Sequence, residues 1–204
     1  MQKYIITIGR QFGSGGIMIA YMLSQKLGIP LYDKKMVTLA AQASGLPESV
    51  VEEYEQKRSS SFLYSLYMST QQLPIQDQIF IAQSNVIKDL AKKESCIILG
   101  RCADYILRDE QNCFKVFIHA PLEERISRVR DEYKAEAKDY EKYVLKKDKE
   151  RSEFYNYNCH TKWGDPKNYH LVINSTIGLN AAAETIKCAV EKMLSDKEGG
   201  NVKL

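Results

Sequence analysis

The stretch GRQFGSGGIM, residues 9–18, has the residue types of a loop that wraps phosphate groups. Gly13, Gly15 and Gly16 permit backbone angles, and a close approach of the chain to a ligand, that side chains would prevent. Consecutive backbone N–H groups in such a loop point at a bound anion, and the helix expected from Ser14 adds the positive end of its dipole. The pattern predicts a site for the phosphates of a nucleotide; the alternative is a strand–helix turn with incidental glycines.

The loop departs from the common phosphate-binding pattern, which ends in Gly-Lys followed by Ser or Thr. Here Gly16 and Ile17 follow Gly15, so the lysine and the magnesium-binding hydroxyl are both missing. Backbone amides and a helix dipole do not depend on that lysine. Phosphoryl transfer, however, depends on positive charge around the moving group. The sequence predicts nucleotide binding with slow transfer, unless another cation supplies that charge.

Charged residues that follow predicted strands, or lie in a charged helical stretch, could supply it. They are Arg10, Lys34, Lys35, Arg101 and Arg151. Arg101 is the strongest candidate because a guanidinium binds phosphate through two parallel hydrogen bonds, although an arginine at a helix start is also commonly a surface residue. Asp33 could hold Mg²⁺ or the acceptor, or it could cap the helix expected from Lys34, and the two roles are compatible.

Short apolar segments that alternate with helical patterns must position these residues. The expected strands are YIITIG, PLYD, CIILG, FKVFIHA and HLVINS, and the expected helices include residues 14–27, 34–43, 48–57, 62–69, 76–92, a charged stretch at 122–156, and 179–194. This alternation predicts an α/β fold, with a parallel sheet covered by helices on both faces. Ligands of such sheets bind at the carboxyl ends of the strands, where the candidate residues lie.

Composition narrows the possible partners and compartment. The net charge is only +3, from 29 basic and 26 acidic residues, which argues against a nucleic-acid partner. The five cysteines are odd in number and form no CxxC pair, which favours reduced thiols in a cytoplasmic protein over disulfides or a zinc site. No apolar run approaches the ~20 residues of a membrane span, and no signal peptide opens the chain, so we expect no membrane partner.

Six stretches taken together resemble the cytidylate kinase-like family, a branch of the P-loop nucleoside-monophosphate kinases. They are ITIGRQFGSGG, LGIPLYDKKMV, IILGRCADYIL, VFIHAPLEERISRV, DKERSEFYNY and WGDPKNYHLVINSTIGL. The resemblance implies a P-loop NTPase fold with a five-stranded parallel sheet in one kinase domain over residues 1–195. It also implies a helical acceptor-binding insert at about 43–76 and a lid at about 132–162. The polar residues 196–204 are expected to form a disordered tail.

The resemblance also implies roles for single residues. The nucleotide phosphates would be bound by Arg10, Gly13, Ser14, Gly15, Gly16 and Ile17. The acceptor would be bound by Lys34, Lys35, Arg101 and Asp104. The catalytic set would be Asp33, Arg101, Asp148 and Arg151, with Asp33 also near Mg²⁺. The departures are Gly16 where the family has lysine, Ile17 where this branch often has arginine, and Val144 where the lid often has arginine.

The function that these residues predict is an ATP- and Mg²⁺-dependent kinase that phosphorylates a small nucleotide-like acceptor, with CMP or dCMP favoured. Two alternatives stay open. The missing lysine is compatible with a catalytically weak nucleotide-binding protein that acts as a sensor or regulator. A kinase of another small metabolite is also compatible, because this fold serves many acceptors.

Overall fold

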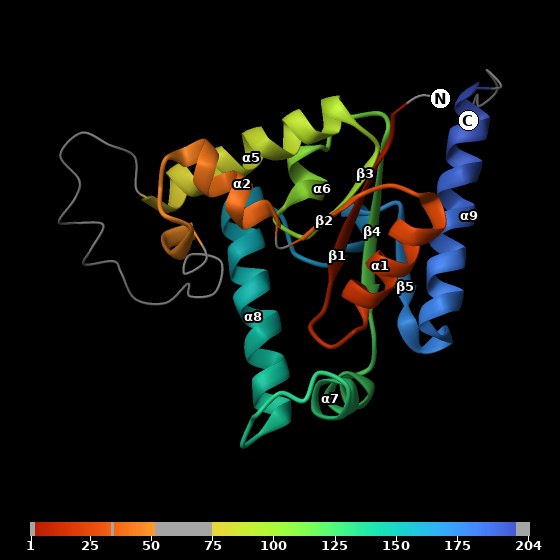
Figure 1. Ribbon diagram of the computed structural model, residues 1–204. Helices are drawn as coiled ribbons and strands as arrows, with labels where there is room; N and C mark the ends of the chain where they lie inside the picture. Colours follow the sequence, from red (N-terminus) through yellow and green to blue (C-terminus); the bar gives the residue numbers. More distant parts are fainter. Residues whose placement is uncertain (1–2, 34, 52–74, 199–204) are drawn as a thin grey trace.

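The computed structural model describes residues 3–33, 35–51 and 75–198. Five parallel strands form one sheet in the order β2-β3-β1-β4-β5 (Figure 1). The strands are β1 (Ile5–Arg10), β2 (Leu31–Tyr32), β3 (Cys96–Leu99), β4 (Cys113–His119) and β5 (Leu171–Asn174). All five coincide with the apolar segments predicted to be strands, and the predicted α/β fold is confirmed.

The first strand of the chain lies in the middle of the sheet. Ile5 of β1 is in register with Cys96 of β3 on one side and with Cys113 of β4 on the other. Ile6 and Ile8 are fully buried. A central parallel strand is covered on both faces, which is why its sequence is a continuous apolar run rather than an alternating one.

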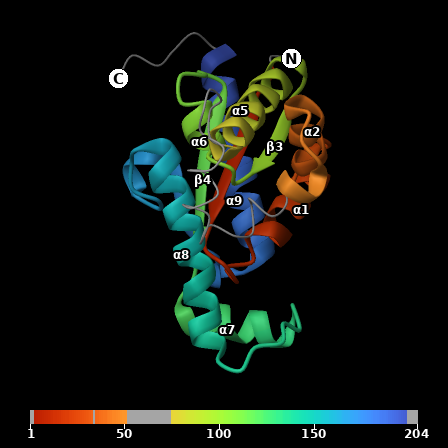
Figure 2. The same ribbon diagram turned by 90° about the vertical axis from the view of Figure 1, so that its left-hand side faces the viewer.

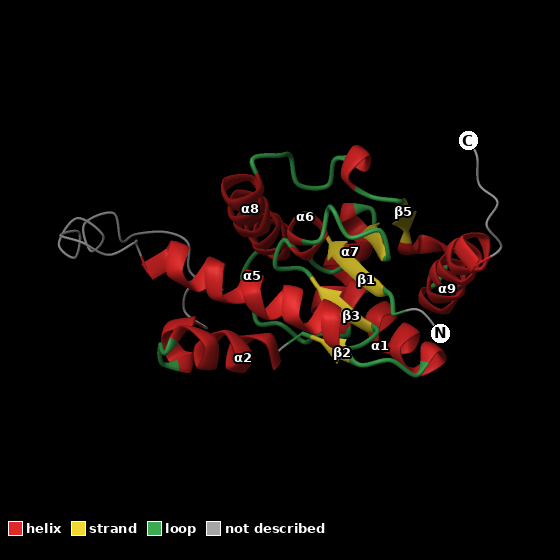
Figure 3. Ribbon diagram, turned by 90° about the horizontal axis from the view of Figure 1, so that it is seen from above, coloured by secondary structure: helices red, strands yellow, loops and turns green. Residues whose placement is uncertain are grey.

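Helices cover both faces of this sheet (Figure 3). On one face, α1 (Gly16–Leu27) and α9 (Leu179–Glu198) pack their apolar sides against β1 and β4. The other face is covered by α5 (Ile75–Lys93), α6 (Ala103–Ile106) and α8 (Tyr140–Cys159). A smaller cluster joins α2 (Lys35–Ser44) to α5. Four of the five cysteines are buried in these layers, Cys188 is exposed, and all five are free thiols.

The charged stretch expected as one helix over 122–156 is two helices. After α7 (Leu122–Asp131) the chain turns, and α8 begins at Tyr140, so the two helices lie at an angle (Figure 2). Lys134 adopts a left-handed backbone angle (φ 50°), and the Asp139 side chain caps α8 by accepting a hydrogen bond of 3.0 Å from the Lys142 N–H. The residues on both sides of this cap are similarly charged, so the composition does not change at the point where one helix ends and the next begins. The prediction of a single helix was therefore wrong.

Two other expected boundaries also need comment. Helix α9 continues to Glu198, three residues into the expected disordered tail, where an i,i+4 ion pair of 2.7 Å between Lys192 and Asp196 supports its last turns. Most of the expected insert, with the helix expected at 62–69, lies outside the described residues.

Within the described ranges, none of the helices is both long enough and apolar enough to cross a membrane.

Candidate active site

The glycine loop connects β1 to α1 at the carboxyl edge of the sheet. Gly13 and Gly15 have left-handed backbone angles (φ 77° and 75°), and α1 begins at Gly16. Ser14 is fully buried, and its hydroxyl donates a hydrogen bond of 2.9 Å to the carbonyl of Gln11. The Ser14 side chain therefore stabilises the shape of the loop.

Neighbouring elements press closely on this loop. A Cβ atom on Gly13 would lie 2.7 Å from the carbonyl oxygen of Arg125, and one on Gly15 would lie 2.5 Å from Cδ2 of Leu179. Both distances are shorter than atoms can approach without a shift of the neighbour. The loop is thus held between α7 and the start of α9, and the left-handed angles together with these contacts favour glycine at both positions.

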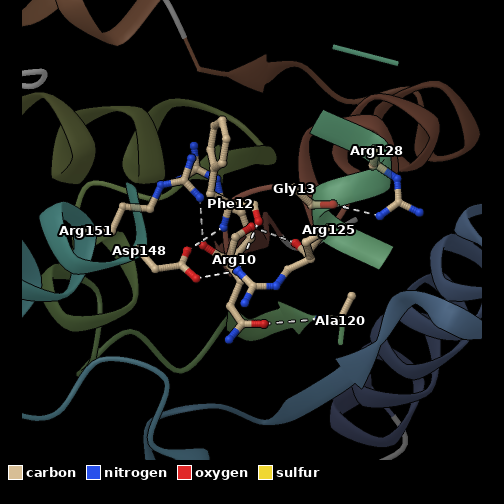
Figure 4. Close-up of polar contacts among 10 residues, drawn as sticks. Arg10, Phe12, Gly13, Ala120, Arg125, Arg128, Asp148 and Arg151 are labelled. Atoms are coloured by element: carbon tan, nitrogen blue, oxygen red, sulfur yellow. Dashed lines mark hydrogen bonds and ion pairs between the residues drawn. The ribbon is translucent and has the colours of Figure 1, made fainter. Parts of the chain in front are cut away.

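Two arginines of α7 that the sequence did not single out contact the loop (Figure 4). Arg128 donates a hydrogen bond of 2.7 Å to the carbonyl of Gly13, and Arg125 donates one of 3.2 Å to the carbonyl of Phe12. Their side chains are only 12% and 6% exposed. In sequence they resemble surface charges on a polar helix; their position just after β4, at the ligand-binding edge of the sheet, was the available signal.

Two predicted residues on α8, Asp148 and Arg151, also reach the loop. One oxygen of Asp148 accepts a 2.7 Å hydrogen bond from the Phe12 N–H, and the other accepts one of 2.5 Å from Arg125. Arg151 donates a 3.1 Å hydrogen bond to the carbonyl of Arg10, and its guanidinium lies 5.3 Å from the centre of the Phe12 ring. Burial lowers the pKa of Arg151, and the charge of Asp148 opposes this shift.

A cavity of about 380 Å³ lies beside the loop, at the ends of β1 and β3. This volume is near the lower end of the range for small-molecule sites, so it suits one small ligand. Its lining falls into three chemical groups. The cations are Arg10, Arg101, Lys147 and Arg151; the carboxylates are Asp33, Asp104 and Glu150; the aromatic side chains are Phe12, Phe154, Tyr155, Trp163 and Tyr169.

The backbone at the end of β3 is strained where it presents Arg101. Gly100, Arg101 and Cys102 all have left-handed angles (φ 75°, 53° and 56°), and two of these residues are not glycine. Non-glycine residues in this conformation cost of order 1–3 kcal/mol each and cluster at functional sites. Arg101 forms an ion pair of 3.6 Å with Asp33, with both side chains largely buried, so Arg101 is not the surface residue of the alternative interpretation.

Asp104 lies on the other wall of the cavity. Its carboxylate accepts a hydrogen bond of 2.6 Å from the Tyr155 hydroxyl, and both residues are 5% exposed. Burial raises the pKa of Asp104, and the hydrogen bond from Tyr155 opposes part of this shift. The pKa of Tyr155 is also raised, by burial and by the nearby Asp104 charge. The cavity lining therefore combines cations, aromatic rings and a buried carboxyl group.

Among the predicted site residues that the structure describes, Ile17 and Lys35 belong neither to the glycine loop nor to the cavity lining. Lys34 lies outside the described residues. Lys35 is exposed at the start of α2 and does not line the cavity. Ile17 packs against the core between α1 and the sheet, so its apolar side chain is explained by packing. Val144 stands where the lid of the family often has arginine. It is fully buried, and burying an unpaired charge at this position would be costly.

Comparison with known proteins agrees with this architecture. A protein from Eubacterium ventriosum ATCC 27560, solved as an uncharacterized protein, shares 31% identity over 94% of this chain and 99% of its own, with a TM-score of 0.71. Two kinases share the fold at low identity. A gluconokinase from Sinorhizobium meliloti 1021 is 10% identical over 98% of this chain and 100% of its own, with a TM-score of 0.63. A shikimate kinase from Bacteroides thetaiotaomicron is 12% identical over 92% of this chain and 98% of its own, with a TM-score of 0.55. No protein of curated function matches the sequence significantly. The sequence profile of the cytidylate kinase-like family matches residues 5–177, and the chain belongs to that family.

Proposed function

We propose that this protein transfers a phosphoryl group from ATP to a small anionic acceptor, with CMP or dCMP as the candidate acceptor. The observation that carries the proposal is the junction of two sites. The glycine loop and the cation-lined cavity share Gly9, Arg10 and Phe12. A nucleotide on the loop and an acceptor in the cavity would therefore be neighbours, and phosphoryl transfer depends mainly on such positioning.

The loop fits the phosphates of a nucleotide. Left-handed angles and close neighbours favour glycine at Gly13 and Gly15, and α1 directs its positive end into the loop. Among the described residues, no three acidic, histidine or cysteine side chains gather to form a metal site. This suits Mg²⁺, which proteins commonly hold through nucleotide phosphates with one or two carboxylates, and Asp33 is the candidate carboxylate. Magnesium would neutralise charge on the phosphates during transfer.

Different residues of the chain would then bind the acceptor and hold the loop. Arg101, held by Asp33, would grip the anionic group of the acceptor from the β3 side. Arg151, on the α8 side, would face it across the cavity. The buried ion pair of Arg125 and Asp148 would keep the loop in position. We also propose that the lid is α8 with the turn that precedes it, and that the acceptor-binding insert follows α2.

The aromatic residues in the cavity lining support an acceptor with a flat ring. Phe154, Tyr155 and Trp163 offer ring surfaces, and the Asp104 carboxyl group offers a hydrogen-bonding partner beside them. A ligand with an anionic end and a hydrogen-bonding ring would find cations, aromatic rings and a carboxyl group in this lining. A nucleoside monophosphate has these two parts.

One assay tests the proposal. Purified protein is mixed with Mg-ATP and single acceptors from a panel of CMP, dCMP, UMP, AMP, GMP, gluconate and shikimate. ADP release is followed, and the product is identified by mass spectrometry. We expect phosphorylated CMP or dCMP. Transfer only to gluconate or shikimate would show that the acceptor is a small metabolite and not a nucleotide. Tight ATP binding without transfer to any acceptor would favour the alternative of a nucleotide-binding sensor.

A further inference from the structure

We infer that Arg10 takes the place of the lysine missing from the glycine loop and brings a cation to the phosphoryl group as it passes from nucleotide to acceptor. This inference rests on the proposed function and names a catalytic residue for it.

The stem of Arg10 fills the space that the lysine side chain would need. Gly16, the first residue of α1, stands where the common pattern has lysine. A Cβ atom on Gly16 would lie 2.8 Å from Cβ and 2.9 Å from Cγ of Arg10. Cβ atoms do not approach other carbons this closely, so a side chain at position 16 and the present position of Arg10 exclude each other. The glycine at position 16 is thus the counterpart of the arginine at position 10.

The head of Arg10 lies at the acceptor side. A Cβ atom on Gly100 would collide with Nη1 of Arg10, so the guanidinium covers the glycine that precedes Arg101. Arg10 also lines the cavity. One side chain therefore begins against the last glycine of the loop and ends beside the acceptor residues, along the line that a transferred phosphoryl group would follow.

The backbone of Arg10 is held firmly at this junction. Arg10 is the last residue of β1 and is in register with Ile118 of β4, and its carbonyl accepts the hydrogen bond from Arg151. An arginine stays protonated at every relevant pH, and its planar head can contact two phosphate oxygens together. A cation fixed in advance lowers the barrier without reorganising, and such a contact typically contributes about 10²–10³ in rate.

Other loop arginines are placed for different tasks. Arg125 and Arg128 donate hydrogen bonds to loop carbonyls from the α7 side, and Arg125 is also paired with Asp148. Arg101 is paired with Asp33 on the far side of Gly100. Of these arginines, Arg10 is the one whose stem occupies the position of the missing lysine.

The test exchanges the two cations. Arg10→Ala and Arg10→Gln should each lower kcat about 10²-fold while the affinity for ADP changes less than threefold; the glutamine variant keeps the stem and removes only the charge. Gly16→Lys alone should lower the melting temperature, because its side chain meets Arg10. The double variant Arg10→Gly with Gly16→Lys should be at least tenfold faster in kcat than Arg10→Gly alone, because only the loss of both Cβ and Cγ at position 10 gives the lysine room. Arg130→Ala, on the exposed face of α7, is the matched control and should behave as wild type.

Defined outcomes would overturn the inference. An Arg10→Gln protein with wild-type kcat would do so, and so would a folded Arg10→Gly, Gly16→Lys protein no faster than Arg10→Gly. If wild-type protein transfers phosphate to no acceptor, the proposed function fails. The role of Arg10 is then judged by binding alone: Arg10→Gln should weaken a non-hydrolysable ATP analogue at least tenfold more than it weakens ADP, and an equal effect on both would refute it.

Discussion

The backbone N–H of Phe12 donates a hydrogen bond of 2.7 Å to Asp148, a residue 136 positions later in the chain. The second oxygen of the same carboxylate accepts a hydrogen bond from Arg125. One side chain therefore joins the glycine loop, α7 and α8. In this arrangement, the position of α8 and the shape of the glycine loop depend on each other.

Asp148→Ala should destabilise the protein by about 3–5 kcal/mol, because it leaves the buried guanidinium of Arg125 without its counter-charge. Urea unfolding followed by circular dichroism measures the loss. Glu153→Ala is the matched control: Glu153 is on the same helix and forms an exposed ion pair of 3.9 Å with Lys149. That control should cost less than about 1 kcal/mol. Equal losses in the two variants would contradict the structural role of Asp148.

Gly15→Ala should abolish measurable ATP binding, whereas Gly28→Ala should not. Both glycines have left-handed angles (φ 75° and 65°), so both substitutions carry backbone strain of about 1–2 kcal/mol. Only Gly15 has a close neighbour, Leu179, while a Cβ atom on Gly28 meets nothing within 4 Å. Titration calorimetry with ATP measures the difference. A folded Gly15→Ala protein with wild-type affinity would show that the loop does not bind phosphate.

Arg101→Ala should lower kcat/KM for the acceptor by about 10²-fold and change the affinity for ATP less than threefold. The reason is its place at the end of β3, beside Asp33 and in the lining of the cavity. Steady-state kinetics with the acceptor varied, together with direct ATP binding, separate the two effects. Arg108→Ala removes an exposed arginine near the end of α6 and serves as the control. Proportional losses of ATP affinity and acceptor turnover would count against this assignment.

Asp104 should make the protein less stable as the pH rises through the acidic range. Burial raises the pKa of Asp104 in the folded state, with the hydrogen bond from Tyr155 opposing, so the folded protein holds this proton more tightly than the unfolded chain does. Its contribution to the free energy of unfolding therefore falls as the pH rises from about 3.9, the ordinary carboxyl pKa, through the raised value. Asp104→Asn should flatten this part of the stability profile, measured by urea unfolding from about pH 3.5 to 7. Parallel profiles would refute the shift.

The strands were predictable because each is encoded by a short local run. The segment IITI is apolar on both faces because β1 is central, and the glycines after it mark the loop. The position of Arg101 was also predictable, since residues that follow a parallel strand must gather at one edge of the sheet.

The contacts of Arg125 and Arg128 were not predictable in the same way. Their partners, Phe12 and Gly13, lie more than 110 residues earlier in the chain, and spacing along a helix carries no information about them. The reason for glycine at position 16 could not be predicted either, because it depends on the position of the Arg10 side chain in the folded protein. Local pattern identified the edge of the sheet, whereas the packing of distant segments decides which cations reach it.

The central place of β1 has a consequence for synthesis of the chain. Ile5 pairs with Cys96 and Cys113, so β1 finds its two neighbours only after roughly half of the described chain has followed it. At a synthesis rate of about 5–20 residues per second, the isoleucines of β1 stay without their partner strands for roughly 5–20 s. Contacts this distant in sequence also make folding slow. During this interval the segment that later supports the glycine loop is a target for chaperones, and for aggregation with other unfinished chains.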